Sequence, residues 1–196
     1  MPVSGYIIHM ILEKAFKNLE EGNARYVSGV PQQTSVSTEL RNNLFTKGQS
    51  PYAAIVGCSD SRVPIELIFD AGPGELFVIR TAGNVIGAFE MGSLEYAVGW
   101  LKTPLVIVVG HQHCGAVHLA LEGGESGEAL EEILQEIRSG IQNANLTDID
   151  AAENDNIRHS LSKIAANPLI AKYVSQGAVR LVAAKYSLET GKVSFF

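Results

Sequence analysis

The chain has 196 residues, 46% of them apolar and 18% charged, a composition that excludes a disordered or collagen-like polymer and predicts one domain over residues 1–196. Its 15 basic and 21 acidic residues give a net charge of −6, without the basic cluster that nucleic-acid binding requires. Neither a membrane span of roughly 20 apolar residues nor the pattern of a signal peptide is found, so we expect a cytoplasmic protein.

The first half of the chain predicts two helices followed by two buried strands. Apolar residues at helical spacing predict a helix over residues 11–27, and a short helix follows over residues 38–45. Continuous apolar runs at residues 52–57 and 76–80 are typical of strands that are buried on both faces. We expect the N-terminal helical segment, residues 9–47, to pack on a partner subunit.

The second half continues the alternation of helices and strands. Helices are predicted over residues 93–101 (with Ser93 as the N-cap), from Gly115 onward, and over residues 128–138 and 151–166; strands are predicted over residues 105–110, 179–184 and the last few residues to Phe196. Strands that alternate with helices indicate an α/β fold: a mostly parallel four-stranded sheet, a short antiparallel C-terminal strand, and helices on both faces.

The two cysteines of the chain leave three interpretations open: buried small apolar residues, a redox pair, or metal ligands. Cys58 directly follows one predicted strand, His111 follows another, and Cys114 comes three residues later, in the first turn of a helix. If the two strands are neighbours in a parallel sheet, these side chains meet at one edge. Helix amides that lower the pKa of Cys114 would favour its thiolate, and two thiolates with one imidazole suit a catalytic Zn²⁺ site.

An acidic and a basic residue follow the first cysteine. Asp60 and Arg62 stand two and four residues after Cys58, and a bidentate contact between them would keep the carboxylate ionised and fixed in orientation. An ordinary loop ion pair is the simpler interpretation. Beside an open metal site, however, a fixed carboxylate can accept a proton from bound water, which makes this pair a catalytic candidate.

Most of the chain closely resembles the β-class carbonic anhydrases. The resemblance is carried by Gly57-Cys58-Ser59-Asp60-Ser61-Arg62-Val63-Pro64, by residues 72–80, and by Gly110-His111-Gln112-His113-Cys114-Gly115-Ala116-Val117. It implies a zinc enzyme that interconverts CO₂ and bicarbonate and assembles as a homodimer or a dimer of dimers. It also implies that Cys58, His111 and Cys114 hold one Zn²⁺ per chain.

The same resemblance assigns further roles. Asp60 and Arg62 would form a catalytic dyad that orients a zinc-bound hydroxide. The implied substrate pocket consists of Gln49, which donates to a substrate oxygen, the aromatic residues Phe77 and Tyr96, and Gly115 beside the zinc. Some members regulate the site with a second bicarbonate, using a tryptophan three residues before the first cysteine ligand. Ile55 stands at that position, which argues against such regulation even though Glu66 and Arg80 match.

Two other functions remain open on the sequence alone. The same scaffold could hydrolyse carbonyl sulfide or carbon disulfide, which are linear analogues of CO₂. Alternatively, the cysteines could belong to a thiol redox switch or to a structural zinc site in a protein without catalytic activity. His113, which lies between His111 and Cys114, is interpreted as a residue that does not bind the metal.

Overall fold

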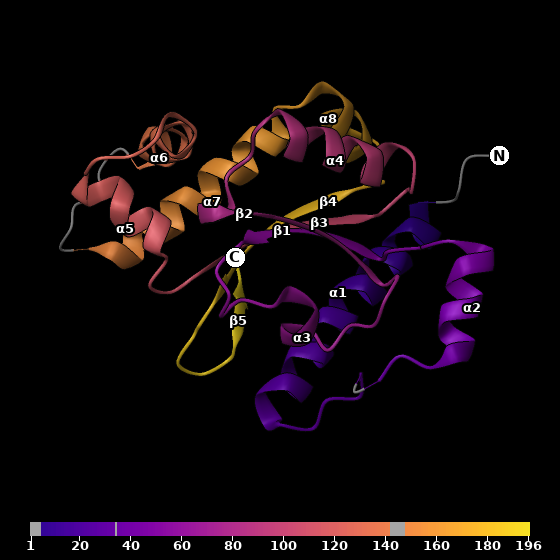
Figure 1. Ribbon diagram of the computed structural model, residues 1–196. Coiled ribbons are helices and arrows are strands. Elements are labelled where there is room, and N and C mark those ends of the chain that lie inside the picture. Colours follow the sequence, from indigo (N-terminus) through magenta and orange to yellow (C-terminus); the bar gives the residue numbers. More distant parts are fainter. Residues whose placement is uncertain (1–4, 34, 142–147) are drawn as a thin grey trace.

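A computed structural model describes residues 5–33, 35–141 and 148–196 of the chain (Figure 1). The first four residues, part of the segment searched for a signal peptide, lie outside this description. Within it, one sheet has five strands in the order β2-β1-β3-β4-β5, with all neighbours parallel except the last pair. The strands are β1 (Ala53–Cys58), β2 (Leu76–Thr81), β3 (Leu105–His111), β4 (Arg180–Tyr186) and β5 (Val193–Phe195). The predicted α/β fold is confirmed.

Helices cover both faces of this sheet, as the continuous apolar strands require. Along β1, Ala53 and Ile55 pack into a cluster with α1 and α3, whereas Ala54 and Val56 pack on the other face with α4, α7 and α8. The helices are α1 (Gly5–Ser28), α2 (Thr38–Lys47), α3 (Ile65–Ile68), α4 (Ala88–Gly99), α5 (Gly115–Glu122), α6 (Glu128–Gly140), α7 (Ile149–Ala165) and α8 (Pro168–Ser175), with a 3₁₀ turn η1 (Ala82–Asn84) after β2.

The prediction for α4 was wrong at its start. The helix begins at Ala88 rather than Ser93, because the carboxylate of Glu90 accepts the amide N–H of Gly87 (2.9 Å) and thereby caps an earlier turn. Ser93 lies inside the helix, where its hydroxyl donates to the carbonyl of Phe89 (2.8 Å). Polar residues with a local partner of this kind can continue a helix, so Ser93 was misread as a cap.

The short helices α3 and α8 and the turn η1 were not predicted. For α8 the sequence does contain a start signal: the side chain of Asn167 accepts the amides of Leu169 and Ile170, and Pro168 occupies the first helical position. Helix α3 has only four residues, too few for an apolar periodicity to be visible.

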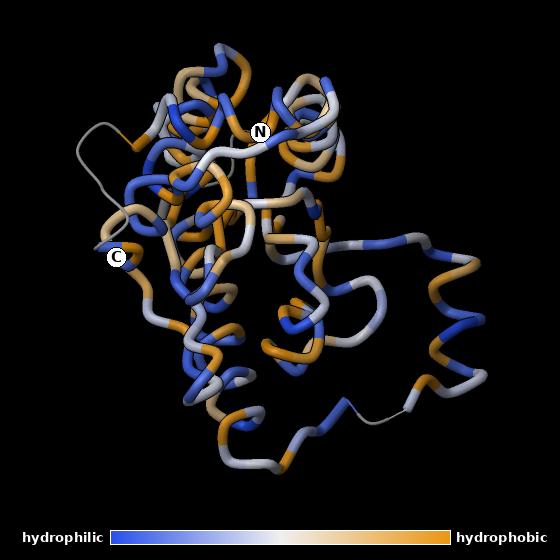
Figure 2. The backbone as a smooth tube through the Cα atoms, turned by 60° about the vertical axis from the view of Figure 1, so that its left-hand side comes forward, coloured by the Kyte–Doolittle hydropathy of each residue, from blue (hydrophilic) through white to orange (hydrophobic). Residues whose placement is uncertain are grey.

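Helix α2 stands apart from the sheet and its covering helices (Figures 1 and 2). It buries none of its residues, and Phe45 is exposed, as are Met10 and Ile11 on α1. None of the helices among the described residues combines the length and the apolar character that crossing a membrane demands.

Candidate metal centre

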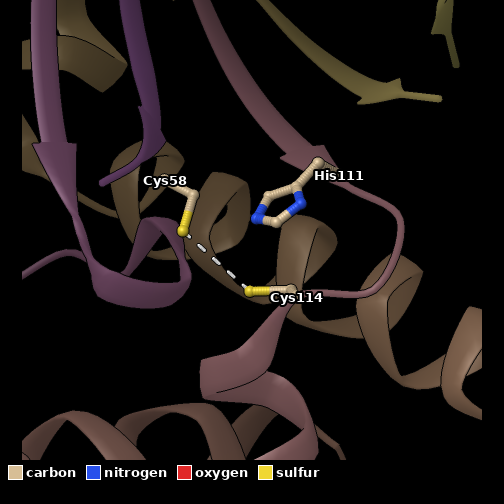
Figure 3. Close-up of side chains that lie close together, drawn as sticks. All are labelled: Cys58, His111 and Cys114. Atoms are coloured by element: carbon tan, nitrogen blue, oxygen red, sulfur yellow. Dashed lines mark hydrogen bonds between the residues drawn. The ribbon is translucent and has the colours of Figure 1, made fainter. Parts of the chain in front are cut away.

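Three sulfur and nitrogen ligands converge at the carboxyl edge of the sheet. Cys58 ends β1 and His111 ends β3, and these strands are parallel neighbours, as the sequence argument assumed. Cys114 lies immediately before α5, so that its side chain points back toward the other two (Figure 3). The two Sγ atoms are 4.0 Å apart, and all three ligand atoms lie within 4.8 Å of one another. All three residues are buried.

Hydrogen bonds orient these ligands. The Sγ of Cys58 accepts the backbone amides of Asp60 (3.4 Å) and Gly83 (3.3 Å). The Nδ1 atom of His111 lies 2.9 Å from the carbonyl oxygen of Gln112, a contact in which Nδ1 donates and Nε2 keeps its lone pair. Nε2 is buried and has no hydrogen-bond partner among the described residues, and it faces the sulfurs. Such a buried, unpaired acceptor is suited to a metal ion.

The two thiols lie close enough to share a proton. The hydrogen bond with Cys114, with smaller contributions from the nearby His111 imidazole and the neighbouring amides, lowers the pKa of Cys58 against the opposing effect of burial. The pKa of Cys114 is raised, first by the proton that it donates to Cys58 and then by burial. The amides of Ala116 and Val117 at the start of α5 lower the pKa of Cys114, as expected from its position, while the proton shared with Cys58 and burial oppose them.

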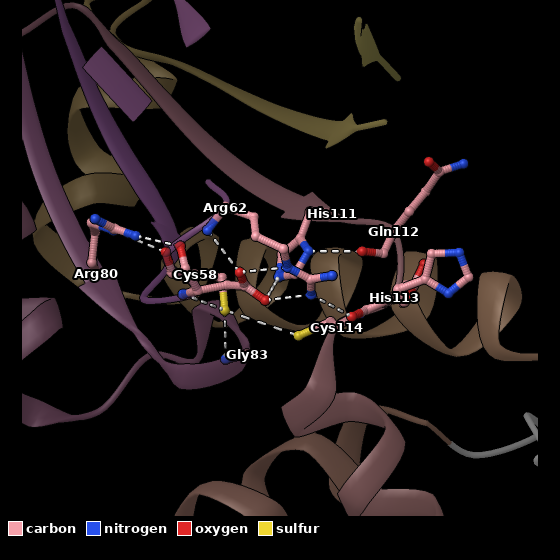
Figure 4. Close-up of polar contacts among 10 residues, drawn as sticks. Cys58, Arg62, Arg80, Gly83, His111, Gln112, His113 and Cys114 are labelled. Atoms are coloured by element: carbon pink, nitrogen blue, oxygen red, sulfur yellow. Dashed lines mark hydrogen bonds and ion pairs between the residues drawn. The ribbon is translucent and has the colours of Figure 1, made fainter. Parts of the chain in front are cut away.

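Asp60 and Arg62 make a bidentate contact beside this cluster. The Nε and Nη2 atoms of Arg62 donate to Oδ1 (3.0 Å) and Oδ2 (2.7 Å) of Asp60, and the Arg62 amide also donates to Oδ1 (2.9 Å). The arginine further donates to the carbonyl of His113 (3.1 Å), which ties the loop after β1 to the loop after β3 (Figure 4). These contacts lower the pKa of Asp60 to about 2. Its Oδ2 lies 3.9 Å from Nε2 of His111.

Two further residues shape this edge: Arg80, which the resemblance connected only with a second bicarbonate site, and Gly83, which sequence reasoning missed. Arg80, on β2, donates to the carbonyls of Cys58 (2.9 Å) and Asp60 (2.7 Å) and so fixes the backbone on either side of Ser59 (Figure 4). Gly83 supplies an amide to Cys58 from η1. The positions of Arg80 and Gly83 follow from the rule that located the cysteines, namely that the carboxyl ends of parallel strands meet at one edge of the sheet. Strand β2 is the other neighbour of β1 and ends at that same edge.

Comparison with known proteins agrees with this geometry. Residues 53–193 match the family described as carbonic anhydrase. Among solved structures, the β-carbonic anhydrase CcaA is 29% identical with a TM-score of 0.72, over 96% of this chain and 87% of CcaA. The chain belongs to the β-carbonic anhydrase family.

Relatives named as carbonic anhydrases are similar to this chain over most of its length. Carbonic anhydrase 2 of Mycobacterium tuberculosis is 38% identical over 91% of this chain and 89% of its own length. A carbonic anhydrase of Mycolicibacterium smegmatis is also 38% identical, over 91% and 90%. A Coccomyxa β-carbonic anhydrase solved in complex with acetazolamide has 26% identity and a TM-score of 0.70, over 78% of this chain and 76% of that one. The chain is thus an enzyme of a family whose general reaction is the hydration of CO₂.

The residues that the β-carbonic anhydrase resemblance assigned to a substrate pocket are not all brought to the cluster. Gly115 directly follows Cys114. Phe77 and Tyr96 lie close to each other, with ring centroids 6.1 Å apart, but Phe77 is paired with Ala54, four residues before Cys58 and about 13 Å away along the strand. Gln49 is exposed in the loop after α2.

Proposed function

We propose that this chain catalyses the reversible hydration of CO₂ to bicarbonate and a proton, using one Zn²⁺ held by Cys58, His111 and Cys114. The observation that supports this most is the convergence of two sulfurs and one imidazole nitrogen, all buried, within 4.8 Å of one another. Zinc bound there supplies a Lewis acid that brings the pKa of a coordinated water toward neutrality. Three protein ligands rather than four are typical of catalytic zinc sites.

The separation of the two sulfurs suits zinc, as does the type of the three ligands. Zn–S bonds of about 2.3 Å and Zn–N bonds of about 2.0 Å in a tetrahedron place the ligands about 3.5–3.8 Å apart. The two sulfurs, at 4.0 Å, are close to this separation and far from the roughly 2.05 Å of a disulfide. The unpaired Nε2 of His111 gains a partner when a metal binds.

In this proposal, Asp60 orients the reacting water. Arg62 occupies Oδ1 with two donors and Oδ2 with one, which fixes the plane of the carboxylate and leaves Oδ2 with capacity for a further hydrogen bond. That oxygen lies on the side of His111 Nε2. Asp60 therefore accepts a hydrogen bond from the reacting water and aligns a lone pair of that water with the carbon of CO₂.

The substrate pocket would be completed by a second copy of the chain, in a homodimer or a dimer of dimers. Within one chain, Phe77 and Tyr96 lie too far along the sheet to line a pocket at Cys58, and Gln49 is exposed. The N-terminal helical segment, residues 9–47, would pack on the partner subunit. The exposed side chains of Met10 and Ile11 on α1 and of Phe45 on α2 support this role, because exposed apolar residues gain from a covering surface.

We also place the protein in the cytoplasm, because both thiols must stay reduced in order to bind a metal and a reducing compartment keeps them so.

Metal analysis and CO₂ hydration assays of a matched histidine pair test this function. His111→Asn removes a proposed ligand, whereas His113→Asn changes an exposed neighbour whose left-handed backbone (φ 53°) asparagine tolerates. We expect one zinc per chain and CO₂ hydration in the wild type and in His113→Asn, and loss of both in His111→Asn. A wild-type protein without zinc whose thiols oxidise freely would instead be a redox protein, and faster turnover of carbonyl sulfide than of CO₂ would make it a hydrolase.

A further inference from the structure

Helix α7 has a buried polar face where an apolar one would be expected. Glu153, Asn156 and Ser160 are spaced three and four residues apart, so they lie on one side of the helix, and each is at most 3% exposed. Burying such groups is costly unless each finds a hydrogen-bond partner. All three find one on the backbone of a distant segment, and these segments carry the two sulfur ligands or their hydrogen-bond donors.

Glu153 binds the segment of the second cysteine. Its Oε1 accepts the backbone amide of Cys114 (3.1 Å), and its Oε2 accepts from Nζ of Lys185 on β4 (2.8 Å). Lys185 also donates to a carboxylate oxygen of Asp150 (2.8 Å), one turn earlier on α7. The lysine thereby anchors this part of α7 to the sheet, and Glu153 in turn fixes the backbone nitrogen of Cys114.

Asn156 and Ser160 bind the turn that orients the first cysteine. The Nδ2 of Asn156 donates to the carbonyl of Gly83 (2.7 Å), and the hydroxyl of Ser160 donates to the carbonyl of Asn84 (3.0 Å). The amide of the same Gly83 donates to Sγ of Cys58. Gly83 and Asn84 both have positive φ angles (67° and 49°), a backbone conformation that glycine adopts freely and asparagine tolerates.

We propose that the polar face of α7, defined as Glu153, Asn156 and Ser160, is a positioning device that sets the two sulfur ligands at the separation required for metal binding. One rigid helix contacts the backbone of Cys114 at one point and the Gly83 turn beneath Cys58 at another. This one element thus contacts the backbone near both sulfurs, which are 56 residues apart in sequence. These are positioning residues, since none of them contacts the ligand atoms themselves. The inference rests on the proposed zinc site.

Stability alone is the competing explanation, because any buried hydrogen bond contributes to folding. A matched control separates the two. Asn23 on α1 is also buried and donates to the carbonyls of Ile68 and Gly191, but its contacts join α1 to α3 and the last hairpin rather than to the sulfur-bearing segments. Asn156→Leu and Asn23→Leu are thus the same substitution of a buried, backbone-bound asparagine at two places, although Asn23 loses three hydrogen bonds and Asn156 one.

The experiment measures zinc affinity by chelator competition, thermal unfolding, and the absorption spectrum of the cobalt-substituted protein, for the wild type, Glu153→Ala, Glu153→Gln, Asn156→Leu and Asn23→Leu. We expect zinc affinity to fall about 10–100-fold in Glu153→Ala and Asn156→Leu, with altered thiolate–cobalt bands. Glu153→Gln keeps an acceptor for the Cys114 amide, so it should recover most of the affinity. Asn23→Leu should unfold more easily while binding zinc as the wild type does.

Two results would overturn the inference separately from the proposed function. If the wild type binds zinc but Glu153→Ala and Asn156→Leu lose only thermal stability, with affinity and spectrum unchanged, α7 does not position the ligands. If the wild type takes up no zinc, the proposed function and this inference fail together. Should Asn156→Leu not fold, the comparison of Glu153→Ala with Glu153→Gln decides, because Lys185 stays paired with Asp150 in both variants.

Discussion

The Asp60–Arg62 and Arg25–Asp70 pairs join the same two residue types but leave their carboxylates in different states. The carboxylate of Asp70 is enclosed: Oδ1 accepts the amides of Gln32 and Gln33, and Oδ2 accepts from Gln32 and Arg25. Its side chain is 1% exposed. The side chain of Asp60 is 17% exposed, and its Oδ2 accepts a single hydrogen bond, from Arg62.

This difference distinguishes a carboxylate that can act on a reactant from one that holds the fold. Both oxygens of Asp70 are fully hydrogen-bonded, to Arg25 and to the segment after α1. Asp70 therefore stabilises the fold and has no oxygen available for a reactant. Asp60 is fixed as firmly by Arg62, yet one of its oxygens faces the ligand cluster with capacity to spare. The same substitution, aspartate to asparagine, should therefore lower catalytic activity at position 60 and conformational stability at position 70.

The largest effect is expected for Asp60→Asn. The asparagine can still accept the Nε and backbone amide of Arg62 through its carbonyl oxygen, but an amide nitrogen replaces Oδ2, which accepts from Nη2 of Arg62 and faces the reacting water. We expect kcat/KM for CO₂ hydration to fall about 10²–10⁴-fold, while zinc content and the unfolding midpoint stay near those of the wild type. Stopped-flow assays with metal analysis measure this. Unchanged turnover would remove Asp60 from the mechanism.

Asp70→Asn is expected to act on stability instead. Asparagine tolerates the positive φ angle of this residue (45°), so the backbone is preserved, but the Arg25 charge loses its partner. Breaking a buried ion pair costs about 3–5 kcal/mol, and because Arg25 is 27% exposed we expect about 2–4 kcal/mol. Urea unfolding measures this cost. Turnover per folded, zinc-loaded molecule should match the wild type, and a loss as large as that of Asp60→Asn would contradict the distinction.

The sequence was sufficient to predict the Asp60–Arg62 contact but not the Arg25–Asp70 contact. Residues two apart in a loop after a strand can contact each other whatever the rest of the chain does. Arg25 and Asp70 are 45 residues apart and meet only because α1 packs on α3, a four-residue helix without a visible periodicity. The strands and the convergence of Cys58, His111 and Cys114 could be predicted because apolar runs and strand ends report directly on sheet topology.

Glu153 shows why the support of the site could not be predicted. It stands among Asp150, Asn154 and Asp155, a stretch that is typical of a solvated helix face. Its burial depends on the Cys114 amide and on Lys185, which lie 39 and 32 positions away along the chain. The spacing of apolar residues identifies the buried face of a helix. A carboxylate on that face is interpreted as exposed, because nothing in the neighbouring sequence shows that it is buried.

The smallest effect is expected at acidic pH, and it sharpens the role of Asp70. Burial raises the pKa of this carboxyl, but the hydrogen bonds from Arg25, Gln32 and Gln33 together lower it below its ordinary value of 3.8. A lowered folded-state pKa adds stability that is complete above the unfolded pKa and disappears as the pH falls through the folded pKa. The stability difference between wild type and Asp70→Asn should therefore be constant above about pH 5 and shrink below about pH 4.

Urea unfolding of both proteins, between pH 7 and the lowest pH at which they fold, measures this difference. Other carboxyls and the metal ligands titrate alike in the two proteins, so their contributions cancel. A difference that does not change with pH would mean that Asp70 contributes through shape rather than charge.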